Sequence, residues 1–340
     1  MATHTAVLIP GDGIGPEVSE AVLEVLEAAR APVEFETRFA GQAALDGGLG
    51  EVLPEATLEA VRQHHLALKG PCTTPIGTGF SSVNVALRKR LKLYTALRPV
   101  RNLPNVKTRY DGVDLVVVRE NTEGLYSGIE NQITDDVVVS MKVATRVACR
   151  RISRWAFRYA TRRGRKKITV FHKANIMKLT DGMLLEEARA AHAESQNIEY
   201  EEAIIDAAQM RLIQDPSQFD ILLCENLYGD LVSDLCAGLV GGLGVCPGAN
   251  IGDEDAVFEA VHGSAPDIAG QNLANPLALL MSAVMLLNHL GETRGDAEGR
   301  AAAARIRAAY DRALSEGQTT RDIGGTLGTR EFARAVIERL

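Results

Sequence analysis

The chain lacks the features that mark secreted, membrane-spanning or disulfide-bonded proteins. Its longest apolar stretch, residues 276–290, is interrupted by Ser282 and is too short to cross a bilayer, so we expect a buried helix there. The N-terminus has neither the basic start nor the long apolar segment of a signal peptide. The five cysteines form no C-x-x-C pair, which is typical of reduced thiols. These absences predict a cytoplasmic protein that does not bind a membrane.

The chain also has no excess of positive charge. Its formal net charge of −7 at pH 7 argues against general affinity for nucleic acid, because contacts with phosphate supply most of that binding. One compact basic run, residues 161–167 ("TRRGRKK"), could bind nucleic acid in principle, but it lies between a predicted helix and the strand "ITVFH". We interpret this run as a solvated connector and expect no nucleic-acid partner.

The composition that remains is that of a globular protein. At 340 residues the chain is long enough for about two domains with substantial cores. Predicted strands alternate with helical periodicity almost throughout, which indicates an α/β protein with largely parallel central strands. We expect helices from Pro16, Pro54 and Ser81, and alanine-rich helices in the C-terminal third. The expected strands are residues 5–10, 33–39, 66–70, 114–121, 167–172, 199–206 and 220–226.

A glycine turn lies in residues 7–18 ("VLIPGDGIGPEV"), between the first strand and its helix. A dinucleotide fingerprint requires G-x-G-x-x-G followed by an acid about 20 residues later. Here Pro16 stands where the third glycine belongs, although Glu34 and Glu36 lie at a suitable distance for the acid. The spacing argues against a Rossmann site and favours a simple bend between strand and helix.

Three aspartates could form a site for a hard cation. Asp230 and Asp234 are four residues apart near the start of a predicted helix and share one face of it. Asp206 closes a predicted strand, where side chains near loops often form sites. Converging carboxylates suit Mg²⁺ or Mn²⁺, whereas an acidic first helical turn would merely complement the helix dipole.

Several other side chains would suit a polycarboxylate substrate. The guanidinium groups of Arg88, Arg98 and Arg119 can bind carboxylates through paired hydrogen bonds, although each arginine alone could equally form a surface ion pair. Tyr126 and Lys173 are candidates for proton transfer, and each could equally serve as an ordinary core or surface residue.

Seven motifs across nearly the whole chain resemble the β-decarboxylating dehydrogenases, the isocitrate/isopropylmalate dehydrogenase family. Within that family the sequence is most similar to the NAD-dependent isocitrate dehydrogenases. The motifs are "GDGIGPE", "LKGPCTTPIGTGFSSVNVALRK", "LRPV", "VVVRENTEGLYSG", "HKANIMK", "YGDLVSDLCAGLVGGLG" and "FEAVHGSAPDIAGQNLANP".

The resemblance implies an α/β fold with a discontinuous large domain and a smaller central domain. The large domain would comprise residues 1–98 and 252–340 and would bind the cofactor. The central domain, residues 99–251, would carry the metal site and form a homodimer. Lys173 and Asp206 would enter the active site of the neighbouring subunit, so each site would be shared between two chains.

The same resemblance implies that the glycine turn does not hold the dinucleotide. The cofactor would be NAD, because Asp267 and Ile268 stand where NADP-dependent relatives carry a lysine and a tyrosine. An acidic side chain there would repel the 2′-phosphate of NADP. The residues expected to contact the cofactor are Thr74, His262, Gly263, Asp267, Ile268, Asn275 and Asp322.

The implied reaction is the oxidation of isocitrate to 2-oxoglutarate and CO₂. Asp206, Asp230 and Asp234 would bind Mg²⁺ or Mn²⁺. Lys173 would assist removal of the hydroxyl proton, and Tyr126 would protonate the carbon after CO₂ leaves. The expected substrate-binding residues are Ser82, Asn84, Arg88, Arg98, Arg119, Tyr126 and Lys173.

The identity of the substrate and the catalytic role of the chain each leave an alternative open. Ser82 and Asn84 would receive a terminal carboxylate, and an isopropyl group would leave them unpaired, although Ser82 could also serve only as a helix cap. Homoisocitrate or 3-isopropylmalate dehydrogenase is therefore an alternative. A non-catalytic regulatory subunit of a heteromeric isocitrate dehydrogenase is a further one, against which Tyr126, Lys173 and the three aspartates all argue.

Overall fold

The computed structural model describes residues 3–74 and 82–340 of the chain. Twelve strands occur within this part. They are β1 (His4–Ile9), β2 (Val33–Thr37), β3 (Leu66–Lys69), β4 (Thr95–Arg101), β5 (Asp114–Glu120), β6 (Gly124–Thr134), β7 (Val137–Val143), β8 (Lys167–His172), β9 (Glu199–Ile204), β10 (Ile221–Cys224), β11 (Pro247–Ile251) and β12 (Ala256–Ala260).

Eleven α-helices accompany the strands within the same residues. They are α1 (Gly15–Ala28), α2 (Gln42–Asp46), α3 (Glu55–His64), α4 (Val83–Arg90), α5 (Arg146–Arg163), α6 (Thr180–Ala193), α7 (Ile205–Gln214), α8 (Asn226–Val240), α9 (Leu277–Thr293), α10 (Ala297–Ser315) and α11 (Thr329–Ile337). Short 3-10 helices lie at Pro216–Gln218, Leu243–Val245, Pro266–Ile268 and Arg321–Ile323.

Ten of the strands form one mixed sheet in the order β2-β1-β3-β12-β11-β4-β5-β10-β8-β9. The first four strands in this order are mutually parallel, and so are the last four. Antiparallel pairs involving β11 and β4 join the two parallel blocks. The expected α/β fold class is therefore confirmed, with an antiparallel centre that the sequence pattern did not predict.

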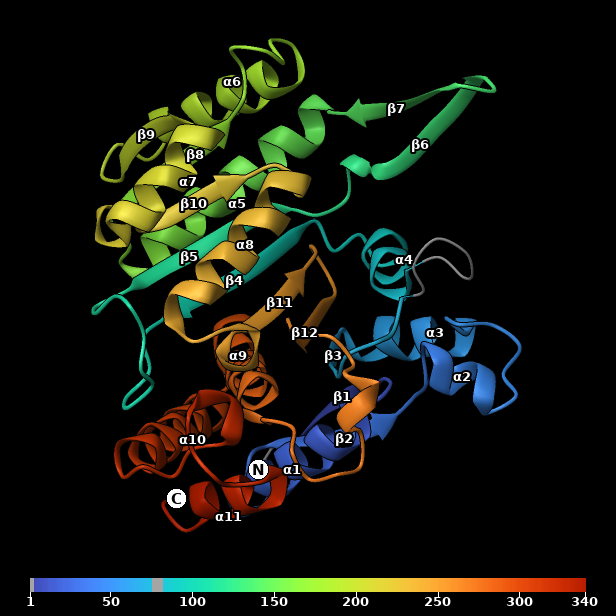
Figure 1. Ribbon diagram of the computed structural model, residues 1–340, viewed down its shortest axis with the longest axis vertical. Coiled ribbons are helices and arrows are strands. Elements are labelled where there is room, and N and C mark those ends of the chain that lie inside the picture. Colours follow the sequence, from blue (N-terminus) through green and yellow to red (C-terminus); the bar gives the residue numbers. More distant parts are fainter. Residues whose placement is uncertain (1–2, 75–81) are drawn as a thin grey trace.

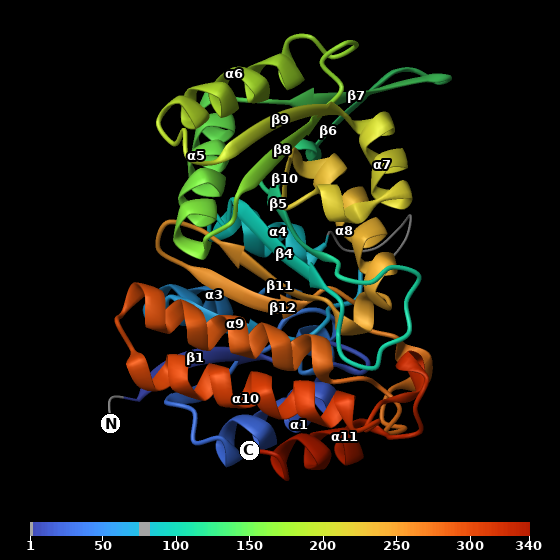
Figure 2. The same cartoon turned by 90° about the vertical axis from the view of Figure 1, so that its left-hand side faces the viewer.

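Helices cover both faces of this sheet (Figures 1 and 2). On one face, α5 packs against β5, β8 and β10, while α9 packs against β3, β11 and β12. On the other face, α8 packs against β4, β5 and β10. The predicted buried helix is confirmed in α9, where twelve residues are buried. No helix in the described part of the chain is long and apolar enough to cross a membrane.

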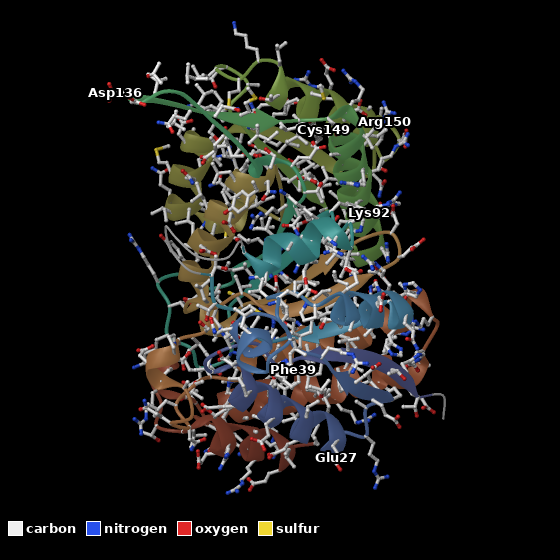
Figure 3. All side chains as sticks on the ribbon, turned by 90° about the vertical axis from the view of Figure 1, so that its right-hand side faces the viewer. Glu27, Phe39, Lys92, Asp136, Cys149 and Arg150 are labelled. Carbon is white, nitrogen blue, oxygen red and sulfur yellow. The ribbon has the colours of Figure 1, made fainter. Side chains whose placement is uncertain are left out.

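The strands β6 and β7 form a separate antiparallel ribbon that projects from the body of the molecule (Figure 1). The side-chain view in Figure 3 places Asp136, in the turn between the two strands, at the outer tip of this ribbon. Most residues of both strands are exposed. This ribbon is the other element that the alternation of strands and helices did not predict.

The predicted strands coincide with observed strands to within two residues at their ends. The expected helices from Pro16 and Pro54 are α1 and α3. The helix expected from Ser81 is described from Val83, because Ser81 and the preceding part of its motif, residues 75–80, lie outside the described residues. The predicted domain boundary at residue 98 falls inside β4, and the two-domain division stays a prediction.

The two ends of the chain pack together beneath the sheet (Figure 2). Helix α1 contacts α11, and the buried hydroxyl of Thr329 lies between the loop before α9 and helix α1. Its Oγ1 is 2.8 Å from Oε1 of Glu17 and 2.6 Å from the carbonyl oxygen of Ala274, so it can donate to either acceptor. One hydroxyl thus connects segments more than 300 residues apart.

We expect Thr329→Val to lower the free energy of unfolding by about 1–3 kcal/mol, because the buried acceptors lose their donor while the side-chain volume is kept. Urea denaturation at a fixed protein concentration measures the change. Thr293→Val is the matched control, since that exposed hydroxyl donates only to its own helix, and its effect should stay within about 0.5 kcal/mol. Equal effects of the two variants would contradict the role given to Thr329.

Candidate functional site

The glycine turn between β1 and α1 is occupied by the protein itself. The N–H groups of Asp12 and Ile14 donate to the carbonyls of Pro71 and Ser264, at 2.7 and 2.8 Å. A Cβ at Gly13 would lie 2.0 Å from the Ser264 carbonyl oxygen. These two amides of the turn are therefore already paired, and the backbone of residue 264 lies directly against Gly13. The turn acts as the bend that its spacing indicated.

The centre of the sheet holds a buried cluster of charges around Glu259 on β12. Lys69 forms an ion pair with Glu259 at 2.8 Å, and Arg88 and Arg98 reach the other carboxylate oxygen at 3.1 and 3.2 Å. Asn250 donates a further hydrogen bond of 2.7 Å. Burial would raise the pKa of Glu259, but Lys69 and then the two arginines hold it well below its usual value. Three cations thus surround one anion.

The cluster leaves buried polar atoms without partners among the described residues. These atoms are Nε of Arg88, Nη1 of Arg98 and Oδ1 of Asn84. A buried polar group without a hydrogen bond is costly, so such atoms mark places where a ligand can supply the missing partner. The excess of positive charge indicates an anionic ligand. The structure brings Arg88 and Arg98 together on Glu259, and Asn84 lies one helical turn before Arg88 on α4. Their role in binding a substrate stays a prediction.

A second group joins Arg119, Tyr126 and Asp230. Arg119 and the Tyr126 hydroxyl both donate to Asp230, and Arg119 also donates to Oδ1 of Asn226 through Nε at 3.0 Å. Burial, followed by the hydrogen bond to Asp230, raises the pKa of Tyr126. Burial, followed by the charge of Arg88, lowers the pKa of Arg119. The influence of Arg88 shows that this group neighbours the Glu259 cluster.

The two helical aspartates lie near each other on α8, as predicted. Burial raises the pKa of Asp234, and the carboxylate of Asp230 raises it further. Neither residue lies in the first helical turn, where Glu225 provides the cap instead, so a simple interaction with the helix dipole does not explain them. A divalent cation suits this pair, because it would relieve the repulsion between two oxygen ligands.

Asp206 does not join that pair within one chain. It lies in the first turn of α7, directly after β9, and accepts a hydrogen bond of 2.5 Å from Nζ of Lys173. That bond lowers the pKa of Asp206 below its usual value. No group of three His, Cys, Asp or Glu side chains able to hold a metal ion occurs among residues 3–74 and 82–340. The three predicted metal ligands are therefore not brought together within this chain, and their joint role stays a prediction.

Large exposed apolar side chains lie near Lys173 in sequence and along the ribbon of β6 and β7. Ile176 and Leu179, close to Lys173 in sequence, are 70% and 86% exposed. The ribbon formed by β6 and β7 is apolar along much of its length. Its exposed large hydrophobic residues are Leu125, Ile129, Ile133, Val137, Val138, Val139 and Met141. Apolar surface of this kind is typical of sites of protein association.

Among the predicted cofactor residues, Asn275 and Asp322 contact each other directly, and His262 contacts its neighbour Gly263. Nδ2 of Asn275 donates to Oδ2 of Asp322 at 3.0 Å, and a Cβ at Gly244 would lie 2.6 Å from the same oxygen, so these segments approach closely. Burial lowers the pKa of His262, whose Nδ1 donates to the Gly263 carbonyl while Nε2 has no partner among the described residues.

Asp267 and Ile268 lie in the 3-10 helix after the loop that contains His262. The Asp267 side chain is exposed and makes no hydrogen bond to the described residues. The backbone carbonyl of Asp267 accepts a hydrogen bond from the side chain of Gln271. The Asp267 side chain is therefore no cap within this part of the chain. Thr74 donates to Oγ of Ser82 at 3.3 Å, and that oxygen also accepts from the Val85 amide at 3.5 Å. Ser82 does cap α4.

Sequence reasoning missed two charged residues of the central cluster, Lys69 and Glu259. Each is almost fully buried, and each stands in an otherwise apolar strand, "LALK" or "AVFEA". A charged side chain inside a buried strand is rare without a partner, and that was the available signal.

Known proteins resemble this chain over nearly its whole length. Isocitrate dehydrogenase NAD catalytic subunit 5 of Arabidopsis thaliana is 48% identical over 338 residues, covering 99% of this chain and 88% of the relative. A regulatory chain of the NAD isocitrate dehydrogenase of Dictyostelium discoideum is also 48% identical, covering 98% and 91%. A 3-isopropylmalate dehydrogenase of Solanum tuberosum is 51% identical over 286 residues, covering 84% and 80%.

The expectation of a cytoplasmic protein is contradicted, because the Arabidopsis and Dictyostelium relatives are both named as mitochondrial. Composition and scattered cysteines do not separate these two compartments, so the expectation had no firm physical basis.

The fold agrees with these relatives. The crystal structure of isocitrate dehydrogenase from Methylococcus capsulatus superposes with a TM-score of 0.93 at 46% identity, covering 99% of each chain. The isocitrate/isopropylmalate dehydrogenase family matches residues 5–336. The chain is a member of the isocitrate/isopropylmalate dehydrogenase family.

Proposed function

We propose that this chain is a catalytic, NAD-dependent isocitrate dehydrogenase that converts isocitrate to 2-oxoglutarate and CO₂. The observation that carries the proposal is the cluster around Glu259, where three cations face one buried carboxylate. The unpartnered nitrogens of Arg88 and Arg98 can then donate to carboxylates of the substrate. Isocitrate carries three carboxylates, so its negative charge complements the excess of positive charge in the cluster around Glu259.

The same cluster favours isocitrate over 3-isopropylmalate. Asn84 presents an unpartnered, buried amide oxygen, and rotation of the amide would present its NH₂ group instead. A terminal carboxylate can accept from that NH₂ group and from the Ser82 hydroxyl. An isopropyl group would leave both residues unsatisfied, and sites built on hydrogen bonds reject such analogues strongly. The similarity to 3-isopropylmalate dehydrogenases keeps that substrate as the alternative.

Asp230 and Asp234, with Asp206 of a second chain, would hold Mg²⁺ or Mn²⁺. Their oxygen ligands and mutual repulsion fit a hard divalent cation. Bound there, the ion would supply Lewis-acid stabilisation of negative charge on the substrate oxygens. Arg119 donates to Asp230 and so fixes the orientation of that carboxylate.

Tyr126 and Lys173 would move the protons. The raised pKa of Tyr126 keeps its hydroxyl protonated, so it can deliver a proton to the substrate carbon after CO₂ leaves. Lys173 would take up the proton of the substrate hydroxyl during oxidation. Its pairing with Asp206 places it beside a proposed metal ligand. A regulatory subunit would not need these groups, and their presence together supports a catalytic role.

The NAD cofactor would lie along the loop from His262 to Asn275, with Asp322 completing the pocket. The free carboxylate of Asp267 can accept hydrogen bonds from the ribose hydroxyls of NAD. The unpartnered Nε2 of His262 and the close approach of Gly244 to Asp322 fit a bound adenosine. Thr74 would approach the nicotinamide end.

The partner would be a second copy of this chain. The apolar ribbon of β6 and β7 would pair with its equivalent, and the exposed apolar residues beside Lys173 would extend the interface. A two-fold arrangement would bring Lys173 and Asp206 of one chain to Asp230 and Asp234 of the other. Each active site would then be shared.

We expect Lys173→Met to lower kcat by roughly 10²- to 10⁴-fold, because methionine fills similar space without a titratable amine. Steady-state assays with isocitrate, NAD⁺ and Mn²⁺ measure the loss. Lys166→Met is the matched control, since that lysine is exposed in the connector before β8. A kcat close to the parent value in Lys173→Met would refute the catalytic assignment.

Mixing the same variant with Tyr126→Phe tests the shared site. In a mixed dimer, one site would receive both intact residues, so equal mixing should restore roughly a quarter of the parent activity. Subunit exchange is verified separately by mass spectrometry of the native dimer. No recovery after verified exchange would show that Lys173 and Tyr126 act within one chain.

We expect the parent protein to prefer NAD⁺ over NADP⁺. The double variant Asp267→Lys with Ile268→Tyr should shift the ratio of the kcat/KM values for the two cofactors toward NADP⁺ by at least about tenfold, or about 1.4 kcal/mol. The added cation attracts the 2′-phosphate that Asp267 repels. Asp111→Lys, in an exposed loop, makes the same charge change elsewhere and should leave the ratio unaltered. Preference of the parent for NADP⁺, or an unmoved ratio in a folded double variant, would reject this assignment.

A further inference from the structure

The glycine turn between β1 and α1, residues 10–14, contacts two distant segments of the chain. The first is residues 71–74, which follow β3 and include Thr74. The second is the loop of residues 262–275 between β12 and α9, which passes beside the turn (Figure 1). Most of the proposed cofactor residues lie in these two segments. The turn is therefore the point where both parts of the proposed cofactor site meet.

The backbone of the turn is hydrogen-bonded to each segment. The Asp12 amide donates to the carbonyl of Pro71 at 2.7 Å, and the Ile14 amide donates to the carbonyl of Ser264 at 2.8 Å. The approach is close, because a Cβ at Gly11, whose φ is +81°, would lie 2.1 Å from the Pro71 carbonyl oxygen. The turn thus fixes one backbone point of each segment.

The side chain of Asp12 holds the first segment a second time. This residue is 6% exposed, and its two carboxylate oxygens accept bonds of 2.8 Å from the amides of Ala43 and Thr73. Gly41 lies directly against the carboxylate, since a Cβ there would come within 2.3 Å of Oδ2. Hydrogen bonds to an ionised acceptor are strong ones. Asp12 therefore fixes the backbone directly before Thr74.

The two segments are also joined to each other beside the turn. The hydroxyl oxygens of Thr73 and Ser264 are 2.7 Å apart and share a hydrogen bond. Ser264 is buried and directly follows Gly263, one of the proposed cofactor residues. Movement of either segment would break this bond in a place where water cannot easily replace it. The positions of Thr74 and Gly263 are thus coupled.

Glu17, in the first turn of α1, holds the far end of the second segment. Its Oε2 accepts from the amide of Asn272, and its Oε1 accepts from the amide of Ala274, both at 3.3 Å. The hydroxyl of Thr329 lies 2.8 Å from the same Oε1. Ala274 directly precedes Asn275, so the carboxylate of Glu17 fixes the backbone beside another proposed cofactor residue.

Both carboxylates face amides of the protein itself. A carboxylate in contact with NAD would repel the pyrophosphate, whereas a carboxylate that binds backbone amides can act through the residues next to them. The three anchored positions, Thr73, Ser264 and Ala274, are each adjacent in sequence to a proposed cofactor residue. This pattern indicates a supporting role toward the cofactor.

We propose that Asp12 and Glu17 are positioning residues for NAD, an inference that rests on the proposed cofactor site. Asp12 would hold Thr74 at the nicotinamide end of the cofactor. Glu17 would hold Asn275 at the adenosine end. The glycine turn would serve the cofactor without binding its phosphates, because segments that are already fixed lose less entropy when a ligand binds.

Calorimetric titration of the full-length protein with NADH tests the proposal without requiring turnover. Asp12→Asn keeps the side-chain volume but turns an NH₂ group toward a backbone amide, so it should weaken NADH binding at least about tenfold. ADP lacks the nicotinamide half, and its affinity should change by less than about threefold in the same variant. A general loosening of the fold would weaken both ligands alike.

Glu17→Gln should weaken NADH and ADP together, by roughly three- to tenfold, because the adenosine end is common to both. Glu17 is only partly buried, so this variant keeps the test available should Asp12→Asn unfold. Asp255→Asn is the control for Asp12, since Asp255 is 7% exposed and pairs with His65 at the opposite end of β12. Glu20→Gln, exposed on α1, is the control for Glu17.

Hydrogen exchange of the free protein tests the contacts themselves. The amide of Thr73 should exchange faster in Asp12→Asn than in the parent, and the amides of Asn272 and Ala274 should do so in Glu17→Gln. Neither change should appear in the two controls. Urea denaturation verifies that each variant is folded.

Unchanged NADH affinity in both folded variants would overturn the inference, and so would losses of the same size in the controls. Equal weakening of NADH and ADP in Asp12→Asn would also overturn it, because the role of Asp12 would then be general stability. Failure of the parent to bind NADH would instead refute the proposed function, and the inference with it. The two failures are therefore distinguished by the parent titration.

Discussion

The ion pairs of the buried Glu259 carboxylate are the interactions on which the rest of the site depends. A carboxylate in the middle of a sheet is costly unless it is paired, and here Lys69, Arg88 and Arg98 surround it. Burial opposes the charge on Lys69, but Glu259 more than offsets it and raises the pKa of this lysine. Both partners therefore stay ionised. Glu259 fixes the two arginines while leaving some of their N–H groups free, which prepares them for a ligand.

The central strands of the sheet carry the charges to one face. Successive residues of β4 and β12 point to opposite faces, so Arg98 and Glu259 lie on one face and Leu97 and Phe258 on the other. Gly248 on β11 lies directly against Arg98, because a Cβ at that glycine would overlap the guanidinium at 1.6 Å. The missing side chain at Gly248 is thus what allows Arg98 to extend toward Glu259.

Much of the fold could be predicted from local pattern, because continuous apolar runs such as β5 mark buried parallel strands. The antiparallel strands β11 and β12 could not, since their pairing depends on distant segments. Among site residues, Arg119, Tyr126, Asp230 and Asp234 come together as expected. Asp206 does not, because it lies at the start of α7, where it pairs with Lys173. Lys69 and Glu259 were missed, because their pairing links strands almost 200 residues apart.

The central claim is that the arginines held by Glu259 bind carboxylates of isocitrate, while Ser82 and Asn84 receive its terminal carboxylate. The most direct measurement compares kcat/KM for isocitrate, homoisocitrate and 3-isopropylmalate, side by side, with NAD⁺ and Mn²⁺. The account predicts that isocitrate exceeds 3-isopropylmalate by at least about a hundredfold, because the isopropyl group leaves buried polar groups unpaired. Equal values, or a preference for 3-isopropylmalate, would contradict it.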